Sequence, residues 1–441
     1  MAGWLRKIVP LGMRRWYHRL LAWTANLRFG RPSRHLVVIG VTGTDGKTTT
    51  AVMIADLLQA AGKKVGLSSS IWWQIGEKRW LNESHMTMPG RFALQRLLRQ
   101  MVTAGCQYAV IEVSSEGLAQ HRHIGVDFDI AVVTNLTPEH LEAHGSWNRY
   151  RSTKGLLFHQ IIRSGDKHRT GLNQKRTTVV NLDDPSAEYF SQFWAEQHLG
   201  VSLHPQPKIP AVMNSKFSVL TATNLRPTPT GSEFIVDGQR LQLHLAGEFN
   251  VANALEAIAV ARACGVSWDV VASTLPQMTT IPGRVQEIPT GRSWRVVIDY
   301  AVTPNALEKL YQTLQTQGAK RLIAVFGAAG GGRDRWKRPE LGKIAARYCQ
   351  QIILTTDDPY DEDPRQIAEA IKRGMVAAQA QAVKIILDRR QAIQRAINLA
   401  QAGDVVAVTG MGAETSMMVK GKKVNWNDAA TAQQLIQGLR P

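Results

Sequence analysis

Short apolar runs alternate with helix-like stretches along the first half of the chain. The runs end in polar or glycine-rich turns, and the stretches between them repeat apolar residues at helical spacing before a closing glycine. This alternation predicts a mostly parallel sheet covered by helices. The expected strands are residues 36–41, 64–70, 108–115, 129–136 and 177–184, with helices at 47–62 and 92–105.

A turn-rich stretch near residue 282 separates this half from a second alternation of the same kind. Residues 231–245 are expected to form a hairpin that turns at Asp237 and Gly238, and residues 246–265 a helix. The stretch 279–291 holds two prolines and two glycines, which is typical of a linker. Further strands are expected at 294–300, 321–327, 351–357, 383–388 and 404–410. We therefore expect an α/β protein with a helical segment at 1–34, a central domain at 35–281 and a Rossmann-like domain at 282–441.

The amino-terminal segment combines an apolar helical face with a basic one. A basic amphipathic helix with aromatic residues suits a membrane interface, and packing of this helix on its own protein is an equal alternative. No apolar run in it approaches the roughly 20 residues that span a bilayer, and it lacks the pattern of a signal peptide. The apolar face holds Met13, Trp16, Tyr17, Leu20, Trp23 and Leu27, and the basic face holds Arg14, Arg15, His18 and Arg19.

Composition favours a globular protein rather than a disordered or disulfide-rich one. Of the 441 residues, 44% are hydrophobic and 20% are charged, as in ordinary folded domains. Cys106, Cys264 and Cys349 lie far apart, which argues against a disulfide framework or a structural zinc site and fits a reducing cytoplasm.

The net charge of +18 raises the question of nucleic-acid binding. The first 44 residues hold eight Lys or Arg and no acidic residue, but no recognised nucleic-acid motif follows. We favour a basic enzyme that handles phosphorylated, carboxylate-rich substrates near an anionic membrane, and we expect no nucleic-acid partner.

The segment VVIGVTGTDGKTTT contains a candidate phosphate-binding loop. The strict pattern G-x-x-x-x-G-K-[ST] requires a glycine where Val41 stands, but the order of strand, glycine-rich turn, Lys, Thr and helix is preserved. Backbone amides from Thr44 to Thr49 can surround phosphate oxygens at the positive end of the helix. We expect Lys47 to reach the terminal phosphates and the hydroxyl of Thr48 to hold Mg²⁺.

The variant loop T-G-T-x-G-K-T-T resembles that of the Mur ligases, ATP-dependent enzymes that add amino acids to the peptidoglycan precursor, and that of the related folylpolyglutamate synthetases. Other blocks follow in the order of the Mur family and are most similar to its tripeptide-synthetase branch. The resemblance covers about residues 36–441. These blocks are YAVIEVSSEGLAQHR (108–122), VVTNLTPEHLEAHG (132–145), YRSTKGLLF (150–158), LAGEFNVANALEAIA, PGRVQEI, IDYAVTPNALEKL, VFGAAGGGRDRWKRPELG, TTDDPYDEDP and VTGMGAE.

The resemblance implies a ligase of peptidoglycan synthesis that phosphorylates the carboxylate of a muramoyl peptide with ATP. The amine of a free amino acid then attacks the acyl phosphate, and catalysis is mostly positioning and charge neutralisation. The catalytic residues implied are Lys47, His140 and Lys154, with Lys154 carbamylated by CO₂. The implied ligands of two Mg²⁺ ions are Thr48, Glu112, His140 and Lys154; His144, four residues after His140, finds no third ligand at zinc-like spacing and is taken as structural.

The remaining site residues also follow from the resemblance. ATP is expected to contact Gly43, Thr44, Asp45, Gly46, Lys47, Thr48, Thr49, Asn250, Asn253, Arg284 and Asp299. The acceptor is expected to contact Thr87, Ser114, Gln120 and Arg122, and the amino acid Arg333, Asp357, Asp358, Gly410 and Glu414. An arginine fork such as that of Arg122 suits a carboxylate or a phosphate.

Three departures from the family pattern bear on the substrates. Only about 35 residues precede the loop, where relatives carry a domain that grips uridine diphosphate, so we expect that handle to be held differently or to be absent. The usual D-N-P-R ends here in Tyr360, which disfavours diaminopimelate, whereas Asp358 and Glu414 favour a cationic side chain such as lysine or ornithine. The usual histidines and lysine of D-Y-A-H-x-P and G-K-G-H-E are replaced by Val302, Ala413 and Met411.

Two kinds of alternative function remain: the same ligase reaction on another acceptor, and a scaffold without catalytic activity. Folate, a polyglutamate chain or a lipid-linked muropeptide could be the acceptor, but the block E-V-S-S-x-G-L argues against folate, and scattered cysteines argue against the zinc-containing amidating relatives. A membrane-bound scaffold with a vestigial nucleotide site is disfavoured by the retained site residues, which are Lys47, Thr48, Glu112, His140 and Lys154. We expect a cytoplasmic monomer, with peripheral membrane contact through residues 1–30 at the inner face of the membrane.

Overall fold

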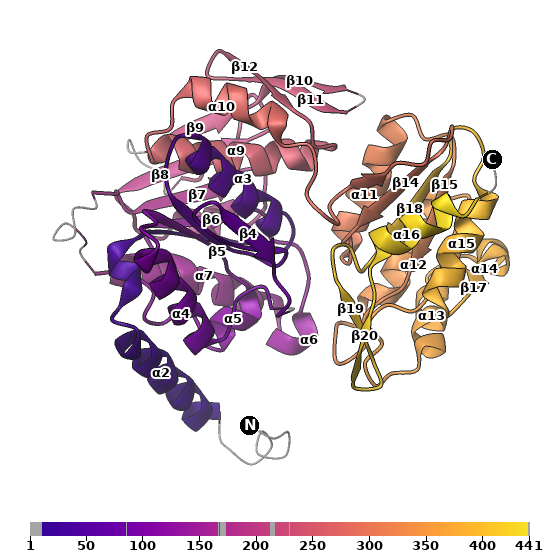
Figure 1. The fold of residues 1–441 in the computed structure, drawn as a ribbon, viewed down its shortest axis with the longest axis horizontal. Helices are drawn as coiled ribbons and strands as arrows, with labels where there is room; N and C mark the ends of the chain where they lie inside the picture. The colour runs from indigo at the N-terminus through magenta and orange to yellow at the C-terminus, as the bar shows by residue number, and fades with distance from the viewer. Residues whose placement is uncertain are drawn as a thin grey trace.

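The computed structural model describes residues 11–84, 86–165, 167, 173–211, 217–228 and 230–439. The first ten residues of the predicted basic segment, and the side chains of Arg14 and Arg15, lie outside this description. The described chain forms two α/β bodies that lie side by side, with the amino-terminal helix at the outer edge of the first (Figure 1). We call them the central domain and the C-terminal domain.

The central domain is built on a nine-stranded sheet in the order β4-β3-β2-β5-β1-β6-β7-β8-β9. All pairs are parallel except β2–β3 and β3–β4, so the prediction of a mostly parallel sheet is confirmed. The chain continues from β1 to β2 and β5 on one side of β1, and then crosses to β6 on its other side. In open α/β sheets, ligands bind at the carboxyl ends of the strands where the strand order reverses in this way. The strands are β1 Val37–Thr42, β2 Val65–Ser68, β3 Trp72–Ile75, β4 Lys78–Leu81, β5 Tyr108–Glu112, β6 Ile130–Val133, β7 Thr177–Asn181, β8 Gln197–Ser202 and β9 Phe217–Thr221.

Helices cover both faces of this sheet, which explains why its strands are continuously apolar. Every residue of β1 is buried, as expected for a parallel strand between two helical layers. One apolar core lies between the sheet and helices α3 and α9, and a second lies under α4 and α7. The helices are α3 Lys47–Ala60, α4 Arg91–Thr103, α5 Ser115–Ala119, α6 Leu141–His144, α7 Trp147–Arg163, α8 Ala187–Ser191, α9 Glu248–Ala263, α10 Trp268–Thr274 and the 3₁₀ turns Pro32–His35 and Leu275–Gln277.

A small antiparallel sheet packs beside α9 and α10 at the far end of the central domain (Figure 1). Its last two strands form the predicted hairpin, whose turn at Asp237 and Gly238 has positive φ angles of 47° and 78°. These values fit the tight turn that the Asp-Gly pair predicted. The strands are β10 Thr223–Thr228, β11 Gly231–Val236 and β12 Gln239–Leu243.

The C-terminal domain is a six-stranded sheet in the order β13-β14-β18-β15-β16-β17, parallel except at β13. The predicted linker therefore differs from the structure, because Gln286–Ile288 of that stretch form edge strand β13 of this sheet. Other strands are β14 Arg295–Asp299, β15 Leu322–Phe326, β16 Gln351–Leu354, β17 Lys384–Ile385, β18 Val405–Thr409 and the hairpin β19 Ser416–Val419 with β20 Lys422–Asn425. The helices are α11 Pro304–Thr316, α12 Lys337–Tyr348, α13 Pro364–Lys372, α14 Ala377–Ala382, α15 Arg389–Leu399 and α16 Asp428–Gln437.

The predicted amphipathic helix is present as α2, Leu11–Arg28. It contacts α4, and its buried residues Ala22, Ala25 and Asn26 face the central domain. Within the described residues, every helix falls short of the length and apolarity that crossing a membrane requires.

Candidate active site

A cavity of about 1250 Å³ lies between the two domains at the carboxyl ends of β1, β5 and β6. Of the residues predicted for the site, all but Gln120 line it. The cavity is therefore one continuous space that could hold a nucleotide, an acceptor and an amino acid together.

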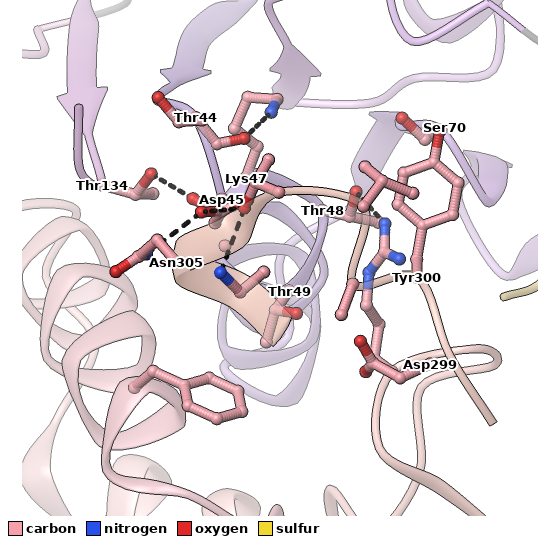
Figure 2. A pocket seen from close by; sticks show the side chains of 18 of the residues that line it. Thr44, Asp45, Lys47, Thr48, Thr49, Ser70, Thr134, Asp299, Tyr300 and Asn305 are labelled. Carbon is pink, nitrogen blue, oxygen red and sulfur yellow. Dashed lines mark hydrogen bonds between the residues drawn. The ribbon is translucent and has the colours of Figure 1, made fainter. Parts of the chain in front are cut away.

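The glycine-rich loop after β1 is held open by residues that follow β6. Thr44 N donates to Asn135 O at 2.8 Å, and Asp45 N donates to Asn135 Oδ1 at 3.0 Å. The hydroxyl of Thr134 donates to Asp45 O at 2.6 Å, and a Cβ on Gly43 would collide with that hydroxyl. Figure 2 shows Asp45 between Thr134 and Asn305. Glycine is thus required at position 43 by the contact that fixes the loop.

The first turn of α3 has the features of an anion-binding site. In the described chain, no side chain caps this helix at Gly46, and the residues of its first turn line the cavity. The first amide groups of a helix have no partner within the helix and can bind an anion. Lys47 bends back over the loop, where its Nζ donates to Thr44 O at 2.7 Å. An ammonium group and the amides at the start of a helix are groups that can bind phosphate.

Glu112, at the end of β5, accepts hydrogen bonds from two hydroxyl groups and one backbone amide beside this helix. Its carboxylate accepts from the Thr48 hydroxyl at 3.0 Å, from Ser70 N at 2.7 Å and from the Ser70 hydroxyl at 3.1 Å. A carboxylate and a hydroxyl are hard oxygen ligands of the kind that Mg²⁺ prefers. The donor set at Glu112 and Thr48 therefore fits Mg²⁺.

Lys154 is a buried lysine beside the glycine-rich loop. Its Nζ donates to Gly43 O at 2.6 Å and lies 4.7 Å from the centre of the Tyr150 ring. Burial, assisted by the nearby charge of Lys47, lowers the pKa of Lys154 well below its usual value. The structure thus favours the neutral, nucleophilic amine at this position.

His140 lies near the same tyrosine, with its ring 6.4 Å from the ring of Tyr150, and has a left-handed backbone conformation with φ of 55°. Burial lowers the pKa of His140 to about 2, and Arg333 and Lys154 act in the same direction. A neutral imidazole can bind a metal ion. His144 is outside the cavity wall, where its Nδ1 lies 3.5 Å from the Thr153 hydroxyl.

The residues predicted near the nucleotide form two groups. Asn253 donates to Asn250 Oδ1 at 3.1 Å and lies so close to Gly46 that a Cβ there would collide with it. These asparagines therefore support the loop from α9. Asp299 accepts from Val285 N at 2.7 Å, and burial raises its pKa to about 6 against the opposing effect of Arg284.

Two arginines, the predicted acceptor residue Arg122 and its neighbour Arg91, are both hydrogen-bonded to Gln120, and we call this pair the arginine clamp. Arg122 donates to Gln120 Oε1 at 2.9 Å and to Met88 O, and Arg91 donates to Gln120 O. Gln120, the predicted residue that does not line the cavity, thus positions Arg122. Burial and the nearby charge of Arg122 both lower the pKa of Arg91.

The other two predicted acceptor residues hold local structure. Ser114 caps α5 by accepting from Gly117 N at 3.1 Å, and the Thr87 hydroxyl lies 2.9 Å from that of Ser70. Through Ser70, Thr87 is linked to Glu112, so the acceptor and metal ends of the site are continuous.

The predicted amino-acid residues converge from three loops of the C-terminal domain. Arg333 is hydrogen-bonded to the Tyr360 hydroxyl and forms an ion pair of 3.6 Å with Glu116 of the central domain. Asp358 accepts from Met418 N at 2.7 Å, which ties its loop to the hairpin β19–β20. Burial raises the pKa of the Tyr360 phenol, and the nearby charges of Asp358 and Glu414 act in the same direction.

Asp357 supports the loops that carry the predicted amino-acid residues. It abuts Gly410 so closely that a Cβ there would collide with its carboxylate. Burial raises the pKa of Asp357 to about 7, against the opposing charge of Arg389. Arg389 in turn donates to Thr409 O at 2.9 Å and forms a buried pair of 2.6 Å with Asp428. This network fixes the two loops that carry Asp357 and Gly410.

Several contacts across the domain boundary were not predicted from the sequence. Lys337 and Glu139 form a buried ion pair of 2.7 Å, and burial raises the pKa of Glu139 against the pull of Lys337. Asp334 accepts from Leu141 N and Glu142 N at 3.0 Å each. These residues lie within two of the family-like blocks of the sequence, but each partner is nearly 200 residues away in the chain, so no local pattern pairs them.

Comparison with known proteins accounts for both domains. The Mur ligase middle domain matches residues 41–261, and the domain described as "Mur ligase, glutamate ligase domain" matches residues 283–412. A UDP-N-acetylmuramoyl-L-alanyl-D-glutamate–2,6-diaminopimelate ligase from Geobacillus thermodenitrificans is 37% identical over 426 residues, which are 96% of this chain and 83% of the relative. A UDP-N-acetylmuramyl-tripeptide synthetase from Roseiflexus is 37% identical over 93% of this chain and 80% of its own length.

Solved structures show the same architecture. A UDP-N-acetylmuramoyl-L-alanyl-D-glutamate–2,6-diaminopimelate ligase matches 91% of this chain and 78% of its own, with a TM-score of 0.58 and 30% identity. The folylpolyglutamate synthase of Mycobacterium tuberculosis, solved with ADP and AMPPCP, matches 96% of both chains with a TM-score of 0.66. At 17% identity, that second likeness concerns the fold alone.

Proposed function

The chain belongs to the Mur ligase family, and on this premise we propose that it joins the carboxylate of a muramoyl peptide to the amino group of a free amino acid. Enzymes of this family are ATP-dependent ligases that form amide bonds in peptidoglycan synthesis. The observation that carries the proposal is the single cavity that contains the phosphate loop, the Glu112–Thr48 pair and the arginine at position 122.

Activation of the acceptor is assigned to the phosphate end of the cavity. The amides of the first turn of α3 and the ammonium of Lys47 would hold the terminal phosphates, and Arg284 would contact the transferred group. Glu112 and Thr48 would hold Mg²⁺, which when bound neutralises phosphate charge. The carboxylate oxygen of the acceptor bonds to the γ-phosphorus as ADP leaves. The amine then displaces phosphate from the acyl carbon and loses a proton.

A second metal position is assigned to His140 and a carbamylated Lys154. The support is the depressed pKa of Lys154, because only a neutral amine adds to CO₂, with release of one proton, to give a carbamate. That modification would replace a neutral amine near Lys47 with an anion, which attracts the ammonium of Lys47.

For the incoming amino acid we propose a cationic side chain, as in lysine or ornithine. The Geobacillus thermodenitrificans relative is named for diaminopimelate, but Tyr360 stands here in the loop that contacts Arg333. Tyr360 offers a phenol rather than a guanidinium to a distal carboxylate, whereas Glu414 and Asp358 add negative charge nearby.

We propose that the reaction takes place in the cytoplasm, with the chain as a monomer, domain limits at 35–281 and 282–441, and peripheral contact of α2 with the inner face of the membrane. The two separate sheets support the limits, and the exposed apolar residues of α2 support the contact.

The test is phosphate release from ATP in the presence of Mg²⁺, measured across a panel of amino acids and muramoyl acceptors. We expect release only when an acceptor and an amino acid are both present, and loss of release in Lys47→Ala. The matched control is Lys343→Ala, because Lys343 is exposed on α12 away from the cavity. Phosphate release that ignores both co-substrates would contradict the proposal.

A further inference from the structure

Helix α2 exposes a row of large apolar side chains that the fold does not use. They are between 42% and 67% exposed, while the opposite side of the helix buries Ala22, Ala25 and Asn26 against the central domain. The helix is thus anchored along one side and open along the other. The exposed residues are Met13, Trp16, Tyr17, Leu20, Trp23 and Leu27.

This row is unlike the rest of the described surface. Elsewhere in the described residues, exposed large hydrophobic side chains occur singly on separate strands, helices or loops, as at Trp194 and Ile209. Single exposed apolar residues are normal, whereas a contiguous group marks an interaction surface. Figure 1 places α2 at the outer edge of the molecule, beside α4 and away from the C-terminal domain.

The charges around the row identify its partner. Helix α2 contains no acidic residue, and Arg19 and Arg28 are exposed beside the apolar row. The first 44 residues hold eight Lys or Arg and no Asp or Glu. Tryptophan and tyrosine prefer the headgroup region of a bilayer, and basic side chains are attracted to anionic lipids. A lipid surface with negative headgroups matches both properties.

The helix also adjoins the acceptor end of the cavity. It packs against α4, whose first residue, Arg91, donates to Gln120 O. Gln120 also accepts from Arg122, which lines the cavity. A surface that covers the exposed row of α2 would therefore lie close to the arginine clamp.

We propose that α2 lies in the headgroup region of an anionic bilayer and holds the acceptor end of the cavity against it, so that the acceptor is a muramoyl peptide linked to a lipid. The choice of acceptor rests on the proposed function, whereas the binding of α2 to lipid does not.

Vesicle flotation of the full chain, without nucleotide, tests the lipid contact. We expect the chain to float with vesicles of phosphatidylglycerol and phosphatidylcholine and to stay behind with phosphatidylcholine alone. The double change Trp16→Glu and Trp23→Glu should lower the bound fraction by about tenfold or more, since it removes two interfacial anchors and adds charge repulsion. Trp194→Glu, at an exposed tryptophan outside α2, is the matched control and should float normally.

Other results would overturn the lipid contact. The proposal fails if the double variant floats like the unchanged chain, or if binding is equal on the two kinds of vesicle. It also fails if light scattering finds a dimer that the double variant abolishes, because the row would then contact a second copy.

The acceptor is tested by the ligase rate in the same vesicles. A lipid-linked acceptor should be used about tenfold more slowly by the double variant, while the rate with a water-soluble muramoyl acceptor stays unchanged. Equal slowing with both acceptors, or with neither, would overturn the acceptor assignment. If no acceptor supports any rate but flotation is normal, the ligase proposal fails and the lipid contact stands.

Discussion

The Arg284 guanidinium lies 3.4 Å from the hydroxyl of Thr48, although 236 residues separate the two in the chain. Arg284 precedes the C-terminal sheet, and Thr48 belongs to the first turn of α3. The ring of Tyr300 stacks against the same guanidinium, 4.6 Å from its centre (Figure 2). The junction between the domains thus carries a fixed positive charge to the phosphate end of the cavity.

Arg284→Ala is expected to lower kcat more than it weakens nucleotide binding. The guanidinium would act on charge that develops during phosphoryl transfer, where loss of one such group costs about a hundredfold or more. Steady-state kinetics should show the fall in kcat, and calorimetry should show ADP affinity within about threefold of normal. Arg347→Ala, on the exposed side of α12, should leave both unchanged. A selective loss of affinity with normal kcat would contradict this role.

Lys154 is expected to make activity depend on dissolved CO₂. Its buried amine has a lowered pKa and can form a carbamate, which buffer free of CO₂ would remove. We expect activity to fall in degassed buffer and to return with bicarbonate, and ¹³C-labelled bicarbonate to give a carbamate carbon signal that Lys154→Arg lacks. Full activity in degassed buffer, with no such signal, would exclude the modification.

Lys337→Met is expected to separate the two domains. It leaves Glu139 buried without its partner, which costs up to about 3–5 kcal/mol. Opening the boundary lets water reach that carboxylate, so small-angle scattering should report a larger radius of gyration. The double change with Glu139→Gln should recover the compact form, and Lys343→Met should not alter it. An unchanged radius in the single variant would argue against this pair as the contact that holds the domains together.

Asp299 is expected to make nucleotide affinity rise with pH. Burial raises the pKa of Asp299 to about 6, so the carboxyl group is protonated at lower pH. A protonated carboxyl group accepts hydrogen bonds from the ribose hydroxyls of the nucleotide more weakly than a carboxylate does. Binding favours the carboxylate, lowers its pKa and releases a proton near pH 6. Calorimetry with ADP in buffers of different ionisation enthalpy should detect that proton, and Asp299→Asn should abolish it. A proton release that persists in the variant would point to another group.

The raised pKa of Asp299 affects folding stability in the opposite direction from nucleotide affinity. Between pH 3.8 and about 6 the folded chain holds a proton on Asp299 that the unfolded chain has released. The contribution of this group to stability therefore falls as pH rises through that range.

The local parts of the fold could be predicted because single segments determine them. A continuous apolar run such as Val37–Thr42 and a glycine-closed helix such as Lys47–Ala60 carry their own signal. The hairpin β3–β4 was missed because its strands mix tryptophan with charged residues and bury only one side chain fully, Gln74. Strand β13 was missed because pairing with β14 overrides the prolines and glycines that flank this short strand.

The candidate site was predicted unevenly for the same physical reason. The phosphate loop depends on neighbours in the chain, whereas Thr303 and Asn305 reach Asp45 across the domain boundary at 3.2 and 3.3 Å. Lys337 and Glu139 likewise meet only when the domains close. No pattern within either segment specifies such a partner. Gln120 was assigned to the acceptor, and its position behind Arg122 became evident only from the hydrogen bonds.

The central claim is that ATP phosphorylates the acceptor carboxylate before the amine attacks, and transfer of an oxygen isotope tests it most directly. The acceptor would carry ¹⁸O in its reacting carboxylate, and the phosphate formed during ligation would be analysed by mass spectrometry. We predict one ¹⁸O atom in each phosphate released together with the amide product, and none without the amino acid beyond background. Ligation that releases unlabelled phosphate, or that places the label in AMP, would contradict the account.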